Sequence, residues 1–74
     1  MIPGLRLRGK VTSINTKYET GLIEDENGKE FFFHKNYTVP LPHWLPELNQ
    51  RVEFTPLPKS PTKPNPVAMA IVAI

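Results

Sequence analysis

Apolar and polar positions alternate along several short segments of this chain. The clearest of them is segment 5–14, in which one face carries apolar or small residues and the other carries polar ones. The first face holds Leu5, Leu7, Gly9 and Val11, and the second holds Arg6, Arg8, Lys10 and Thr12. A period of two is the side-chain period of a β-strand. The pattern therefore predicts a strand whose outward face is a basic stripe.

Segments 21–25 and 29–35 flank the dipeptide Asn27-Gly28, which is a strong signal for a β-hairpin turn. A two-residue turn would mix charged and apolar residues on both faces. A three-residue loop over 26–28, with Gly28 at positive φ, places Ile23 opposite Phe31 and gives one face without charges. We prefer this register, which buries Phe31 and Phe33 and leaves Leu22 and Phe32 on the polar face.

Two more strands are expected after the hairpin. In segment 50–55, Val52 and Phe54 point one way while Arg51 and Glu53 point the other. Segment 67–74 would serve the core through Val67, Met69 and Ile71, but its opposite face is apolar as well, with Ala68, Ala70, Val72 and Ile74. A strand that is apolar on both sides is normally covered on both sides. One interpretation is a homodimer contact through Val72 and Ile74, and the other is simple packing of the chain end.

Most of the nine prolines gather in two stretches, 38–46 and 56–66, which we expect to be loops because proline breaks both helices and sheet ladders. In the first loop, Trp44 and Leu41 are expected to pack onto the barrel. An alternative is that rings of this region, Tyr37, His43 and Trp44, turn toward the strands. The second loop carries Lys59 and Lys63 and is expected to be a stiff spacer, with a phosphate-contacting arm or a ligand for an aromatic groove as alternatives.

Composition narrows the possible functions. The 74 residues suffice for a single domain over 1–74, and no ten-residue helical period interrupts the strands. The chain has no cysteine and two histidines, so we expect no disulfide, no metal site and no cofactor. We also expect no enzymatic activity, because the sequence shows neither a candidate nucleophile nor a phosphate-binding loop. No apolar run is long enough to span a membrane and no signal-peptide core is seen, which favours a cytoplasmic protein. The net charge of +2 permits nucleic acid as a partner.

A family resemblance lies in the stretch GKVTSINTKYETGLIEDENGKEFFFHKN, residues 9–36, which is similar to bacterial cold-shock proteins and Y-box domains. Looser similarity continues in LPELNQRVEF and NPVAMAIV, so that nearly the whole chain is covered. The positions that carry the family's own residue are Gly9, Lys10, Val11, Asn15, Gly21, Ile23, Phe32 and His34. With the strand pattern, the resemblance implies an all-β fold: a five-stranded antiparallel Greek-key barrel of the OB-fold, cold-shock type. An SH3-like barrel is the alternative.

The resemblance also implies a function, the binding of single-stranded RNA or DNA on a strand face, in RNA chaperoning or in regulation of transcription or translation. Bases stack on exposed rings there, and lysines meet phosphates. Ser13, Thr20, Leu22 and Lys35 stand where the family has aromatic residues, while Arg8 comes from the basic stripe. The predicted nucleic-acid-binding residues are Arg8, Lys10, Ser13, Thr20, Leu22, Phe32, His34 and Lys35. The alternative function is a protein-interaction or homodimerisation module that uses a degenerate cold-shock fold.

Overall fold

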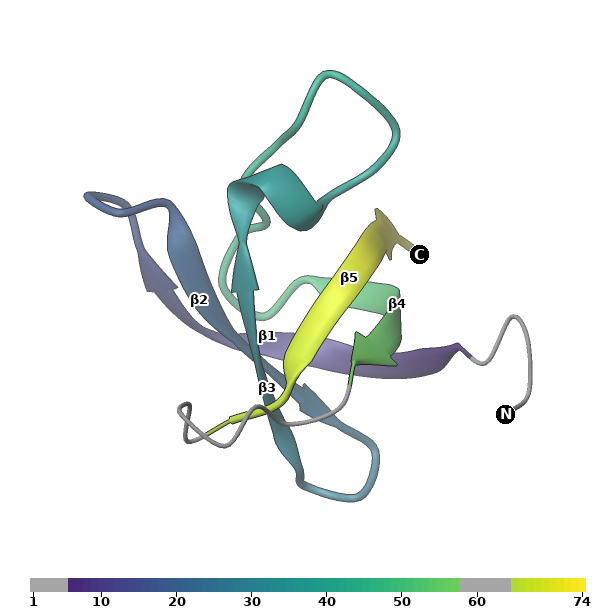
Figure 1. The fold of residues 1–74 in the computed structure, drawn as a ribbon. Helices are drawn as coiled ribbons and strands as arrows, with labels where there is room; N and C mark the ends of the chain where they lie inside the picture. Colours follow the sequence, from purple (N-terminus) through teal and green to yellow (C-terminus); the bar gives the residue numbers. More distant parts are fainter. Residues whose placement is uncertain (1–5, 58–64) are drawn as a thin grey trace.

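The computed structural model describes residues 6–57 and 65–74, which form five strands and one short helix. These are β1 (Leu7–Asn15), β2 (Thr20–Asp25), β3 (Glu30–His34), the 3-10 helix η1 (Lys35–Tyr37), β4 (Arg51–Leu57) and β5 (Val67–Ala73). The strands close into a barrel in the order β1-β2-β3-β5-β4 (Figure 1). The prediction of an all-β, five-stranded barrel is therefore confirmed, and the strand order is OB-fold-like.

Antiparallel pairing joins every pair of neighbouring strands except β3 and β5. Those two run parallel and share a single register pair, Phe32 with Val67. The Phe32 N–H donates a hydrogen bond of 2.8 Å to the Pro66 carbonyl oxygen at this junction. The barrel is thus closed by short pairing between β3 and β5, beside the longer ladders of the other strands.

The barrel interior is filled by side chains from all five strands. The buried apolar residues are Val11, Ile23, Phe31, Phe33, Val52, Phe54, Ala68 and Ile71. Gly21 belongs to the same interior, where a Cβ atom would lie 2.2 Å from the Ser13 carbonyl oxygen and 2.8 Å from the Phe33 ring. The close approach of β1, β2 and β3 at this point therefore depends on the absence of a side chain.

The β2–β3 hairpin has the register expected from its amphipathic pattern. Ile23 pairs with Phe31 and Leu22 pairs with Phe32, while Gly28 takes a φ of 84° in the loop. Phe31 and Phe33 are buried, and Phe32 is half-buried on the outer face. The three-residue loop over 26–28 and the division of the two faces are confirmed.

A bulge in β1 changes the alternation that begins at the start of the strand. The register with β2 shifts between Val11 and Ser13, so that Thr12 and Ser13 are both exposed. After the shift, Ile14 turns inward and packs against the core. A bulge places two residues of one strand opposite one residue of its partner, which is why the period of two is interrupted here.

The core face predicted for β5 is partly wrong, because a second irregularity lies in this strand. Ala68 and Ile71 are buried, whereas Val67 and Met69, which were expected in the core, are only half-buried. Ala70 has a φ of 52°, and the β4–β5 register shifts between Glu53 and Thr55. Because this shift exchanges the two faces of β5 midway, both faces of the strand read as apolar in the sequence.

Pro56 was expected in a loop and instead lies within β4, where it pairs with Ala68. Among the described residues, β1 pairs with β4 only as far as Leu7 and Phe54, so the ladder on that side has ended before Pro56. Proline is tolerated in a strand where no ladder bond needs its N–H. Leu5 of the first predicted strand and residues 58–64 of the second proline-rich loop, with Lys59 and Lys63, lie outside the described residues.

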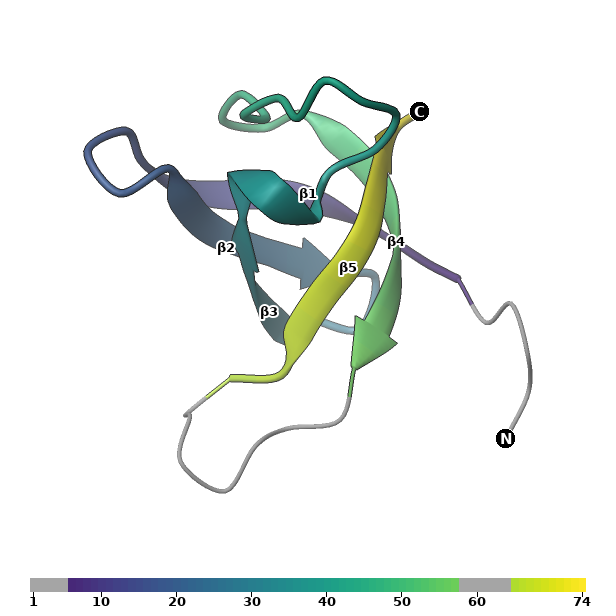
Figure 2. The same cartoon turned by 45° about the horizontal axis from the view of Figure 1, so that its top comes forward.

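The chain after η1 covers the end of the barrel at which β5 finishes (Figure 2). Thr38 is buried there, and its hydroxyl donates to the Lys35 carbonyl oxygen at 2.7 Å and accepts from the Trp44 N–H at 2.9 Å. The Trp44 indole N–H donates to the Val39 carbonyl oxygen at 3.1 Å, and its ring packs against the core. The packing role predicted for Trp44 is confirmed, but that of Leu41 is wrong, since Leu41 is 71% exposed.

Candidate nucleic-acid interface

The outer face of β1, β2 and β3 is built from cross-strand rows of side chains. One row joins Ser13, Leu22 and Phe32, and the next row toward the β1–β2 turn joins Asn15, Thr20 and His34. Residues directly opposite in such rows have Cβ atoms about 4.5–5.5 Å apart. The structure therefore brings together five of the predicted residues, which we call the β1–β3 face: Ser13, Thr20, Leu22, Phe32 and His34.

Phe32 and His34 present two rings on this face because they are two positions apart in one strand. Both side chains are half-buried. The His34 Nδ1 accepts a hydrogen bond of 2.9 Å from the Asn36 N–H, which fixes the ring at the start of η1. The Tyr37 ring follows, with its centroid 5.9 Å from that of His34. Tyr37 thus does lie beside a strand residue, although it also packs against the core.

Lys10 lies in the neighbouring row, whose members on β2 and β3 are acidic. It pairs with Glu24 of β2, and Glu24 pairs in turn with Glu30 of β3. All three side chains are exposed. Because this pair of carboxylates repels a phosphate backbone, the Ser13–Leu22–Phe32 row is the last row of the β1–β3 face in the direction of the β2–β3 loop.

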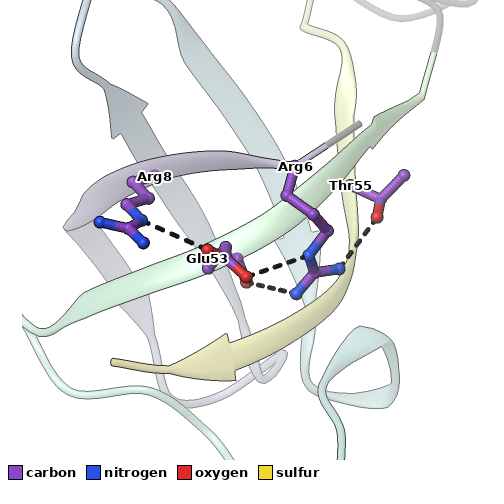
Figure 3. Close-up of polar contacts among 4 residues, drawn as sticks. All are labelled: Arg6, Arg8, Glu53 and Thr55. Carbon is purple, nitrogen blue, oxygen red and sulfur yellow. Dashed lines mark hydrogen bonds and ion pairs between the residues drawn. The ribbon is translucent and has the colours of Figure 1, made fainter. Parts of the chain in front are cut away.

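Arg8 and Arg6 are engaged by a single carboxylate on β4 (Figure 3). The Arg8 Nε donates to Glu53 Oε2 at 3.3 Å, and the Arg6 Nε donates to Glu53 Oε1 at 3.4 Å. Arg6 also donates to the Thr55 hydroxyl at 2.9 Å and to the Glu53 carbonyl oxygen at 3.2 Å. These arginine hydrogen bonds, from Arg8 first and then Arg6, lower the pKa of the Glu53 carboxyl below its ordinary value of 4.5. The predicted basic stripe is therefore partly neutralised by an ionised glutamate.

Lys35 is separated from the β1–β3 face by its place in η1. Its ammonium group forms an ion pair of 3.1 Å with Glu19 of the β1–β2 turn. Because Glu19 offsets its charge, Lys35 attracts an anionic ligand less strongly than the sequence suggested. In the same turn, the Lys17 ammonium lies 5.4 Å from the centroid of the exposed Tyr18 ring.

Two exposed residues near these surfaces were not among the predicted nucleic-acid-binding residues. Arg51 of β4 pairs with Lys10, which brings a second cation beside it. Tyr18 has a largely exposed side chain, and its backbone N–H donates a hydrogen bond of 3.2 Å to the Asn15 Oδ1 in the Asn15–Thr20–His34 row. The signal for Arg51 was its outward position beside Val52, but its neighbour on β1 depends on a strand pairing that local alternation does not specify.

Residues 6–57 and 65–74 contain no group of three or more His, Asp or Glu side chains arranged to hold a metal ion. Within the same ranges no helix has the length and apolar character needed to cross a membrane. No protein-family model matches the chain, and no curated protein matches it.

Proposed function

We propose that this domain binds single-stranded RNA or DNA through the β1–β3 face. The observation that carries the proposal is the placement of Phe32 and His34 two residues apart on one outward strand face, beside Leu22, Thr20 and Ser13. No carboxylate stands in the two rows that hold them. Half-exposed rings on a sheet face are surfaces on which bases of any sequence stack.

The barrel supports this proposal because OB-folds use the strand 2 and strand 3 face to bind oligonucleotides. The sequence resemblance to cold-shock and Y-box domains points to the same face. In that family, Phe32 and His34 would keep two of the ring positions, while Ser13, Thr20, Leu22 and Lys35 depart from the aromatic pattern. With two rings in place of a full platform, we expect binding of micromolar or weaker affinity.

Fluorescence anisotropy of an end-labelled oligopyrimidine, titrated with the full chain at about 50 and about 200 mM salt, tests the proposal. We expect saturable binding with a slope of log affinity on log salt of roughly −1.4 to −2.1, because two or three phosphates that meet cations beside the face, such as Arg8 and Lys10 on β1, contribute about −0.7 each. Phe32→Ala should weaken binding about tenfold at both salt concentrations, since one stacked base contributes about 1–3 kcal/mol.

Two variants serve as controls for this titration. Phe32→Trp keeps an aromatic surface and should retain binding, whereas Leu41→Ala removes an exposed apolar side chain of the loop after η1 and should leave binding unchanged. Duplex DNA should compete poorly, because its bases are stacked inside the helix. Equal binding of duplex and single strand with no effect of Phe32→Ala would reject the stacking face in favour of a protein-interaction module.

A further inference from the structure

The outer surface of β1 and β4 carries four cations and one carboxylate. The register places Arg8 opposite Glu53 and Lys10 opposite Arg51. Val52 and Phe54 are buried, so the residues that alternate with them in β4 point outward. We call this the β1–β4 surface, and its charged residues are Arg6, Arg8, Lys10, Arg51 and Glu53.

The pair Lys10 and Arg51 is unusual because it sets two like charges directly opposite each other, an arrangement that destabilises an antiparallel pair. Both side chains are exposed. Among the described residues, neither one takes part in an ion pair. Across the sheet, Lys10 pairs with Glu24 on β2, and Glu24, Asp25 and Glu26 line a 230 Å³ cleft together with the two cations. An anionic ligand on the β4 side would relieve the repulsion between Lys10 and Arg51.

Arg6, directly before β1, and Arg8 in β1 differ in how much of the guanidinium remains available. Arg6 donates through three nitrogens and its side chain is 27% exposed, so it serves the local structure (Figure 3). The Arg8 side chain is 61% exposed, and its one contact with Glu53 uses Nε. Within the described part of the chain, the two terminal nitrogens of Arg8 therefore remain for an oxyanion, and a guanidinium fork suits phosphate oxygens.

We propose that Arg8, Lys10 and Arg51 bind the sugar–phosphate backbone of a single strand, alongside the base-stacking residues of the β1–β3 face. This inference rests on the proposed function and adds Arg51 and the β4 side of the barrel to it. A nucleic-acid strand is favoured over an acidic peptide because β1 belongs to both surfaces, with Lys10 in the row next to Ser13, Leu22 and Phe32. The carboxylates of Glu24 and Glu26 confine the backbone to the β4 side.

An abasic oligodeoxynucleotide is the direct probe, since it keeps the phosphates and removes the bases. Against this probe and an oligopyrimidine of equal length, Arg51→Gln and Lys10→Gln should each lower affinity about 5- to 10-fold at about 50 mM salt. Each should also make the salt slope shallower by about 0.7. Lys29→Gln, which removes the same charge from the β2–β3 loop, is the matched control and should leave both affinities unchanged.

Phe32→Ala separates this inference from the proposed function. It should weaken binding of the oligopyrimidine and leave binding of the abasic strand unchanged. If Phe32→Ala acts on the oligopyrimidine while Arg51→Gln changes neither affinity nor slope, the backbone surface is wrong and the stacking function stands. If Arg51→Gln weakens both probes while Phe32→Ala affects neither, the stacking function is wrong and the backbone surface stands.

Glu53→Gln should change the affinity in the opposite direction. It removes the carboxylate that neutralises Arg8 and should raise affinity for the abasic strand about 3-fold or more at about 50 mM salt, an effect that added salt screens. Unchanged or lower affinity would contradict the role assigned to Arg8. Tighter binding of an acidic peptide than of an abasic strand of equal charge would overturn the choice of nucleic acid.

Discussion

Three consecutive phenylalanines in β3 occupy two different environments. Phe31 and Phe33 are 3% and 0% exposed, and the ring centroids of Phe31 and Phe54 lie 5.0 Å apart. Phe32 lies between them on the outer face, in the row with Leu22. The same side chain therefore contributes to the core at two positions and to a surface at the third, so that stability and ligand binding can be tested separately.

Urea denaturation of three single variants tests this division. Phe33→Ala and Phe31→Ala should each lower the free energy of unfolding by about 3–5 kcal/mol, because each removes a large buried side chain from a closed core. That loss is comparable with the whole stability of a small domain. Phe32→Ala should cost distinctly less, and equal losses for all three would contradict the register.

At the scale of the strands, bulges decide which side chains reach the core. The shift in β1 turns Ile14 inward, and the shift beside Ala70 turns Ala68 and Ile71 inward together. Gly21 lies opposite Ile14, next to the irregular part of β1. The close packing of β1 against β2 leaves no room for a side chain at Gly21, since the Ser13 carbonyl oxygen is 2.2 Å from where a Cβ atom would lie.

Gly21→Ala should therefore lower the free energy of unfolding by about 3 kcal/mol or more, because the backbone of β1 must move to admit the methyl group. Gly28→Ala is the matched control, since Gly28 has a φ of 84° and open space around it. Its cost should be only about 1–2 kcal/mol, from the left-handed backbone alone. Thermal or urea unfolding measures both, and a Gly21→Ala variant as stable as Gly28→Ala would contradict the close approach.

Oligomeric state is a property of the complete domain, and two residues at the end of β5 were predicted to form a homodimer contact. Ala68 and Ile71 face the interior, which leaves Val72, half-buried, and Ile74, 56% exposed, as the candidate contact. Two side chains bury far less than the roughly 1,000 Å² that a stable interface requires. The homodimer through these residues stays a prediction, and these two side chains alone are too small a contact to stabilise it.

Light scattering at high protein concentration tests the oligomeric state. We expect a mass close to 8.4 kDa, the mass of one chain. A mass of twice that value would support the dimer, and Val72→Lys should then restore the monomer by placing a charge in the contact. A doubled mass that Val72→Lys leaves unchanged would place the contact elsewhere.

Much of the barrel follows from local pattern, and so does the candidate face. The turn at Asn27-Gly28 and the alternation around it specify the β2–β3 register, because a slip of one residue would expose Phe31 and Phe33. That register alone puts Leu22 and Phe32 in one row. The positions of Val67, Met69 and Pro56 could not be predicted, because a bulge and the end of a ladder depend on the neighbouring strand.

Local pattern in the chain predicts the strands, the hairpin and the outward placement of Phe32 and His34, since each depends on residues close together in the chain. The partners of the cations, in contrast, follow from the pairing of strands that are distant in the chain. Glu53 reaches Arg8 across 45 positions of sequence, and Arg51 stands beside Lys10 through the same β1–β4 pairing. The charge that a ligand meets on this barrel depends on such long-range pairing, because opposite charges neutralise one another only where the fold brings their strands side by side.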